Sequence, residues 1–209
     1  MNKKNIAVRK GKGYGIVERI IDMLQEISFG HSYFEVANLL RHSLFLSSIL
    51  LNSEVWYGLT LSDIEQLEVV DQFLLRRILE APSSTPKVSL YLEMGCLPIR
   101  FIIKSRRIMF LHYILNQKQD SLIFKFFQAQ LENPVKGDWS EQVKSDISEI
   151  DLKLTMEEIS ILSKEAFRTK LKKAINAAAF KWLMKEKDNK SKLKDLYYEK
   201  LEMPWNQLP

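Results

Sequence analysis

Glycine and proline are sparse along this chain, and their wide spacing limits what it can fold into more than any other feature. The 209 residues include seven glycines and six prolines. Folds built of many short strands need turn residues at short intervals, so long stretches without them favour helices. Hydrophobic residues make up 46% and charged residues 27%, which is typical of a folded globular chain. The sequence therefore predicts an all-α fold.

Capping residues and helix breakers predict where the helices begin and end. Ser32 and Glu35 have the spacing of a capping box, in which a hydroxyl and a carboxylate satisfy free backbone donors at a helix start. Asp138 with Glu141, and Thr155 with Glu158, also indicate capped helix starts, and Gly95 stands where a left-handed cap usually ends a helix. The helices expected from these signals and from apolar periodicity cover residues 16–27, 32–52, 62–79, 87–94, 98–116, 121–133, 164–187 and 193–201.

The composition of the sequence changes at two points. Residues 1–13 carry five lysines and arginines and no acid, and glycines stand at positions 11, 13 and 15. We interpret 1–13 as a flexible basic lead-in. Residues 14–133 are expected to form an irregular helical bundle, and residues 134–209, which begin at Pro134 and are more polar, a looser helical arm.

The chain contains no recognisable catalytic or metal-binding motif. No two aspartates are adjacent, so the paired carboxylates that hold two metal ions in polymerases are missing. Its three histidines are scattered, and the single cysteine, Cys96, excludes a cysteine-cluster zinc site. Cys96 could be a nucleophile at a helix start, but a small buried cysteine is the interpretation we favour. We expect a protein that is not an enzyme and has no metal or cofactor.

Membrane insertion and export are not indicated either. The longest apolar stretch, residues 43–51, is about half of a membrane span and is expected to be a buried helix. The first residues are basic but lack the apolar core of a secretory signal. We therefore expect an intracellular protein of the cytoplasm or nucleus. The net charge of +5 and the pI near 9.1 allow a polyanionic partner.

One predicted helix has only cations on its polar side. Between Met94 and Gln119 there is no acidic residue, and Arg100, Lys104 and Arg107 fall at i, i+4 and i+7. These three residues, the Arg100 stripe, would be the hydrated side of an otherwise buried helix and suit the phosphates of a duplex. The alternative is a solvated edge that serves solubility.

Two further basic groups are less distinctive. Lys10 and Lys12 belong to the lead-in and could form a non-specific phosphate arm. Lys164, Arg168, Lys170, Lys172 and Lys173 follow one another closely, but Glu165 lies among them. Mixed charge of this kind is common on an ordinary exposed helix.

Several short sequences in a fixed order resemble a known family. They are KGKGYGIV at 10–17, FEVA at 34–37, LRHS at 40–43, LNSEVWYGLT at 51–60, LEVVD at 67–71, LYLEMGCLPIR at 90–100 and SRRIMFL at 105–111. Together they resemble the region that follows the palm in reverse transcriptases of non-LTR (LINE-like, R2-like) retrotransposons. The resemblance runs from about Arg9 to Trp139.

This resemblance implies a thumb-like bundle at 14–133 that packs on template–primer nucleic acid. It adds Arg41, Arg76 and Arg77 to the Arg100 stripe as nucleic-acid-binding residues. The expected partners are an RNA/DNA duplex and a palm/fingers polypeptide. Because the palm aspartates are missing from this chain, it would be a non-catalytic fragment of an RNA-directed DNA polymerase. A helical protein-interaction module and an inert folded remnant of a transposable element remain the alternatives.

Overall fold

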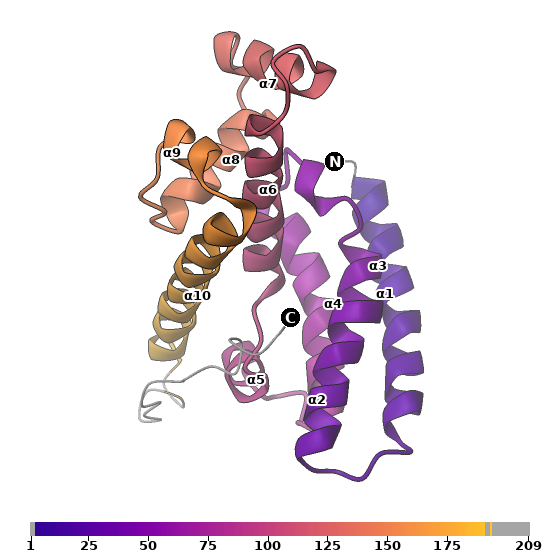
Figure 1. The fold of residues 1–209 in the computed structure, drawn as a ribbon. Coiled ribbons are helices and arrows are strands. Elements are labelled where there is room, and N and C mark those ends of the chain that lie inside the picture. The colour runs from indigo at the N-terminus through magenta and orange to yellow at the C-terminus, as the bar shows by residue number, and fades with distance from the viewer. Residues whose placement is uncertain (1–2, 191–192, 194–209) are drawn as a thin grey trace. The chain divides into compact units, whose positions relative to one another are not determined.

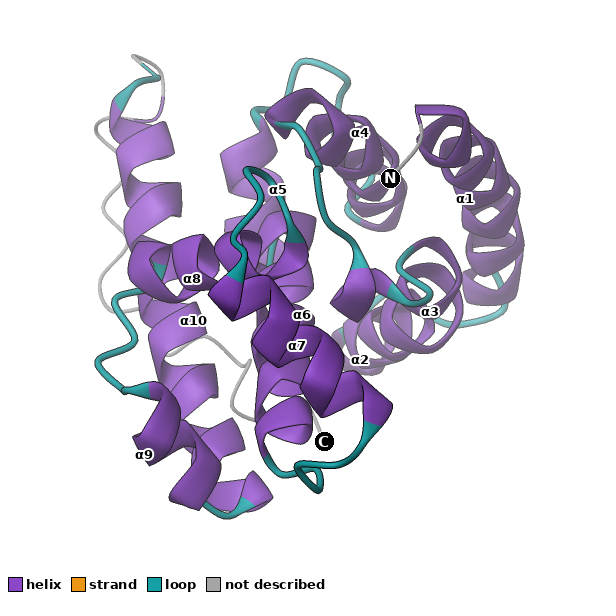
Figure 2. Cartoon of the chain, turned by 90° about the horizontal axis from the view of Figure 1, so that it is seen from above, coloured by secondary structure: helices purple, strands orange, loops and turns teal. Residues whose placement is uncertain are grey.

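The computed structural model describes residues 3–190 and 193, and these contain helices but no strand. The predicted all-α class is confirmed (Figure 1, Figure 2). The elements are α1 (Lys3–Leu24), α2 (His31–Leu40), η1 (Arg41–Leu46), α3 (Ser47–Ile49), η2 (Ser53–Val55), α4 (Leu61–Ile78), α5 (Lys87–Met94), α6 (Ile99–Leu115), α7 (Leu122–Glu132), α8 (Trp139–Glu149), α9 (Met156–Ile161) and α10 (Lys164–Asp188). The helix predicted at 193–201 lies outside the described residues, apart from Leu193.

The chain divides into two compact units. Unit 1 comprises residues 52–60 and 100–180, and unit 2 comprises the described residues of 2–51, 61–99 and 181–209. The boundary expected at Pro134 falls inside unit 1 and does not coincide with this division. The reason is that α8, which follows Pro134, supplies Asp146 to a buried ion pair with Arg107 of α6.

The basic lead-in is a helix from Lys3 onward, so the prediction that residues 3–13 are flexible is wrong. In unit 2, α1 packs against α2, α3 and α4 (Figure 1). Ile6, Gly13 and Val17 are buried on one side of α1. A Cβ atom added at Gly13 would lie 2.9 Å from Cγ1 of Val70 on α4. Gly13 therefore allows two helices to approach closely, which offsets the roughly 1 kcal/mol that a mid-helix glycine costs relative to alanine.

The helix expected at 32–52 is interrupted by a π-helical segment. α2 ends at Leu40, and η1 follows as a π-helix from Arg41 to Leu46. The capping box expected at Ser32 does not form, because the helix begins one residue earlier with Gly30 as N-cap and no side-chain cap. A π segment shifts the angular position of the residues around it and is often found at functional positions. Arg41, the first residue of η1, is fully buried.

Other predicted boundaries are confirmed. Gly95 ends α5 in the left-handed conformation, with φ 58°. Thr155 and Glu158 form the predicted capping box of α9, and Asp138 caps α8. Among the helices of the described residues, none has the length and apolar character needed to cross a membrane.

Candidate nucleic-acid interface

Arg107, the last residue of the Arg100 stripe, is an internal side chain of unit 1. Its Nε atom donates to Asp146 Oδ2 at 2.7 Å and its Nη2 atom to Asp146 Oδ1 at 3.0 Å. Nη1 donates to the carbonyl oxygen of Trp56 at 3.3 Å. Arg107 is 2% exposed, and Asp146 is also buried. A guanidinium held in this way has no face left for a phosphate.

Lys104 joins the same cluster one helical turn earlier. Its Nζ atom lies 3.6 Å from Asp146 Oδ1 and also pairs with Glu149. Arg100 is half-buried. The prediction that the Arg100 stripe is a hydrated cationic side is therefore wrong for Lys104 and Arg107. The physical reason is that α8 places two carboxylates, three residues apart, against that side of α6.

The pKa of the Asp146 carboxyl depends both on its burial and on its charged partners. Burial raises the pKa of its carboxyl, while the nearby Arg107 and Lys104 charges act in the opposite direction. We regard the carboxyl as ionised at neutral pH, because two cations and two short hydrogen bonds from Arg107 compensate for the lost hydration. The cluster is a structural ion-pair network inside unit 1.

Arg41 forms a second buried ion pair, in unit 2. Its Nε atom donates to Asp71 Oδ1 at 2.8 Å, and its Nη2 atom donates to Asp71 Oδ2 at 2.7 Å and to the carbonyl oxygen of Leu97 at 3.0 Å. The hydroxyl of Tyr91 donates to Asp71 Oδ2 at 3.2 Å. Arg41 and Asp71 are both 0% exposed. Arg41 is therefore not available to a nucleic acid, and its prediction as a binding residue is wrong.

The remaining predicted residues of unit 2 reach the surface in different places. Arg76 is half-buried and donates through Nη2 to the carbonyl oxygen of Thr85 at 3.1 Å. Arg77 is exposed, and its Nη1 atom lies 3.2 Å from Glu18 Oε1. On α1, Lys12 is exposed and Lys10 is half-buried. The structure thus leaves Arg76, Arg77, Lys10 and Lys12 accessible, while Arg41 stays in the core.

The basic group that sequence reasoning discounted is on the surface of unit 1. Phe167, Leu171 and Ile175 of α10 are buried and face the core. Its cations from Lys164 to Lys173 occupy the remaining sides: all of these are exposed except Lys172, which is half-buried. These five residues, the α10 cations, are Lys164, Arg168, Lys170, Lys172 and Lys173. Within the described part of the chain, none of the five forms an ion pair.

The positions of the α10 cations follow from helix geometry. Lys164, Arg168 and Lys172 are four residues apart and form one row, with about 6 Å of helix axis between neighbours. Lys170 and Lys173 lie farther around the exposed arc. From Ala166 to Phe180 the helix contains no acidic residue. This acid-free run was the sequence signal that could have identified the surface, and Glu165 at its edge concealed it.

The described residues contain no group of three or more His, Cys, Asp or Glu side chains that could hold a metal ion. Comparisons of the chain with protein-family models, with curated proteins and with solved structures find no match. The contacts, exposure and charge of its side chains, together with the resemblance of its sequence, are what bears on its function.

Proposed function

We propose that this chain is a non-catalytic helical segment that binds the phosphate backbone of a nucleic-acid duplex through the α10 cations. The supporting observation is the contrast within unit 1. Lys104 and Arg107 pair with carboxylates of α8, whereas the α10 cations are accessible and, among the described residues, without an ion-pair partner. Accessible unpaired cations displace counterions from phosphates, which is the main source of affinity that does not depend on base sequence.

The resemblance to reverse transcriptases extends this proposal to an origin. In that case the chain is the thumb-like and linker region of a retrotransposon RNA-directed DNA polymerase, its duplex is an RNA–DNA hybrid, and its partner is a palm/fingers polypeptide that carries the catalytic aspartates. The reading frame before Met1 tests this origin. We expect an aromatic-x-Asp-Asp motif within roughly a hundred residues upstream, the allowance for the rest of a palm domain. A frame without one contradicts the proposed origin and leaves duplex binding to be tested separately.

Charge removal tests the binding surface. The variant Arg168→Gln, Lys170→Gln, Lys173→Gln changes three exposed side chains of α10. A matched control, Lys118→Gln, Lys125→Gln, Lys144→Gln, removes the same charge from three other exposed positions of unit 1. Affinity for a labelled RNA–DNA hybrid, followed by fluorescence anisotropy, should fall about tenfold in the α10 variant, at roughly 0.5 kcal/mol for each exposed cation.

The control separates a local surface from overall charge. We expect it to bind within about threefold of the unchanged protein, since none of its lysines is on α10: Lys118 follows α6, Lys125 is on α7 and Lys144 is on α8. Equal losses in the two variants would mean that net charge alone attracts the hybrid. Undiminished binding by the α10 variant would exclude the α10 cations as the contact. Circular dichroism checks that both variants keep their helix content.

A protein-interaction module is the second candidate, favoured by α7. Leu122 and Phe126 of that helix are 87% and 72% exposed and, four residues apart, lie on one side. An apolar pair of this kind is suited to another helix, and a second copy of the chain is the simplest partner to test. If copies associate through α7, the variant Leu122→Ser, Phe126→Ser should reduce the mass measured by light scattering without changing hybrid affinity.

A further inference from the structure

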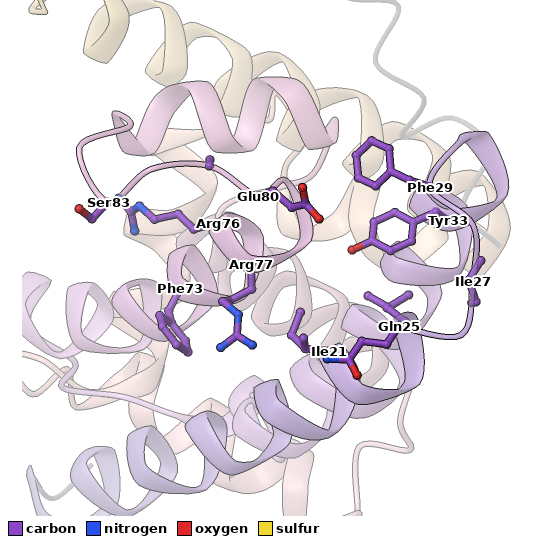
Figure 3. A pocket seen from close by; sticks show the side chains of 12 residues that line it. Ile21, Gln25, Ile27, Phe29, Tyr33, Phe73, Arg76, Arg77, Glu80 and Ser83 are labelled. Carbon is purple, nitrogen blue, oxygen red and sulfur yellow. The ribbon is translucent and has the colours of Figure 1, made fainter.

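Unit 2 contains an open pocket with two chemically different ends. Its volume is about 660 Å³, within the range of small-molecule sites. Figure 3 shows Arg76, Arg77 and Ser83 toward one end, and Phe29, Tyr33 and Ile27 toward the other. The side chains that line the pocket come from the end of α1, the loop that follows it, the start of α2, the end of α4 and the loop after α4.

Arg76 and Arg77 supply the hydrogen-bond donors of the cationic end. Arg76 donates through Nη2 to the Thr85 carbonyl oxygen, but its buried Nε atom has no partner among the described residues. Nε is enclosed and out of a ligand's reach, so an anion in the pocket would contact the terminal nitrogens of the half-buried Arg76 guanidinium. Arg77 lies with its guanidinium carbon 5.9 Å from the centroid of the Phe73 ring. Its pairing with Glu18 is exposed on both sides and is therefore weak.

The other end offers hydrocarbon surface. Phe29 is 62% exposed, although its ring centroid lies 5.0 Å from that of Tyr33. The Tyr33 hydroxyl donates to the carbonyl oxygen of Ile78 at 3.2 Å, so the polar atom of this ring is already satisfied. Tyr33 is only 8% exposed, so the apolar contact that this end can offer a ligand comes mainly from the Phe29 ring.

We infer that this pocket binds a small molecule in which one anionic group, a carboxylate or a phosphate, is attached to an apolar body. The anion would accept hydrogen bonds from Arg76 and Arg77, and the apolar body would cover Phe29 and Tyr33. Glu80 is the one acid among the lining residues, against two arginines, and Glu18, outside the lining, pairs with Arg77. That balance favours a single anionic group over a polyanion.

Titration of the full chain with simple probes tests this pocket. Phenyl phosphate and octanoate represent the two sources of the anion, with inorganic phosphate and octylammonium as probes that lack the apolar body or the negative charge. We expect phenyl phosphate, octanoate or both to bind at millimolar concentrations, with shifts of the Phe29 and Tyr33 ring signals in NMR spectra. Inorganic phosphate and octylammonium should bind at least about tenfold more weakly, because each makes only half of the contacts.

Two variants and a control complete the test. Arg77→Gln should weaken the anionic probes about tenfold, since a hydrogen bond to a charged group contributes about 1.5–3 kcal/mol. Phe29→Ala should weaken them about threefold, through lost apolar contact. Arg19→Gln removes an exposed arginine outside the pocket and should leave binding unchanged.

The relative affinities of the probes identify the class of ligand or overturn the inference. Stronger binding of phenyl phosphate points to an aromatic phosphate, and stronger binding of octanoate to a fatty or aliphatic acid. No binding of either probe, inorganic phosphate as strong as phenyl phosphate, or equal losses in Arg77→Gln and Arg19→Gln would overturn the inference.

Discussion

Each unit contains a buried arginine that forms an ion pair with an aspartate of another helix, and the two pairs differ in how completely they are buried. Arg41 of unit 2 and Arg107 of unit 1 each donate twice to their aspartate and once to a backbone carbonyl oxygen. The pair in unit 2 is enclosed: both partners are 0% exposed, and Tyr91 adds a hydrogen bond to Asp71. The pair in unit 1 continues through Lys104 to Glu149, which is exposed.

This difference has an energetic meaning. Among the described residues, no second cation pairs with Asp71 if Arg41 is lost. Asp146, in contrast, has Lys104 beside it as well as Arg107. Removal of one partner from a fully buried ion pair leaves an unpaired charge in the core, which is strongly destabilising. The two arginines have the same apparent role, but unit 2 should depend on its arginine more than unit 1 does.

Arg41→Met should have the largest effect on stability. Asp71 would remain buried without its cation, and we expect the free energy of unfolding to fall by about 3–5 kcal/mol. Urea denaturation followed by circular dichroism measures this loss. The double variant Arg41→Met, Asp71→Leu removes both charges and should recover most of the stability. A double variant no more stable than the single one would show that packing, rather than the unpaired carboxylate, causes the loss.

Arg107→Met should be less damaging. Lys104 Nζ stays within 3.6 Å of the Asp146 carboxylate, so one cation remains to balance it, and we expect a loss of about 2 kcal/mol. The same denaturation experiment applies. The comparison of the two units fails if Arg107→Met costs as much as Arg41→Met. Adding Lys104→Met to Arg107→Met should bring unit 1 to the larger loss expected for unit 2.

High pH should weaken unit 2 through Cys96, which is buried near Arg41. Burial raises the pKa of its thiol from 9.0 to about 12. The folded protein therefore keeps a proton that the unfolded chain releases above the ordinary value, so stability falls as pH rises from about 9 toward 12. One pH unit above the ordinary thiol pKa, the loss should be about 1.4 kcal/mol. Cys96→Ala should flatten this part of the stability profile, and an unchanged slope would exclude Cys96 as its source.

Asp138, the N-cap of α8, should have the smallest effect. Its carboxylate accepts from the backbone N–H of Glu141, and this hydrogen bond lowers the pKa of Asp138. Since the folded pKa is depressed, the contribution is present above the unfolded value and is lost as pH falls through the folded one. Asp138→Ala should cost about 1 kcal/mol at pH 7, whereas Asp138→Asn keeps a cap and should cost less. Equal losses would show that the cap is not what stabilises α8.

Local signals predicted the elements well, and tertiary partners explain what the sequence did not show. Gly95, Asp138 and Thr155 end or begin helices as expected, because their effects act within a few residues. Arg107 and Asp146 are 39 residues apart, so nothing in the helix around Arg107 indicates its partner. One hint existed: Asp71 shares the buried side of α4 with Leu67 and Leu74, and a carboxylate in such a position calls for a buried cation. Gly13 was similarly ambiguous, since close helix packing and a flexible segment both favour glycine.

Lysine acetylation of the full chain, with and without an RNA–DNA hybrid and read by mass spectrometry, tests most directly where the cations act. In the free protein, Lys170 and Lys173 should be modified readily, and Lys104 slowly, because its ammonium group is enclosed by Asp146 and Glu149. The hybrid should protect Lys170 and Lys173 and leave Lys104 unchanged. A Lys104 that reacts rapidly in the free protein and is protected by the hybrid, while the α10 lysines are not, would contradict both the buried cluster and the proposed interface.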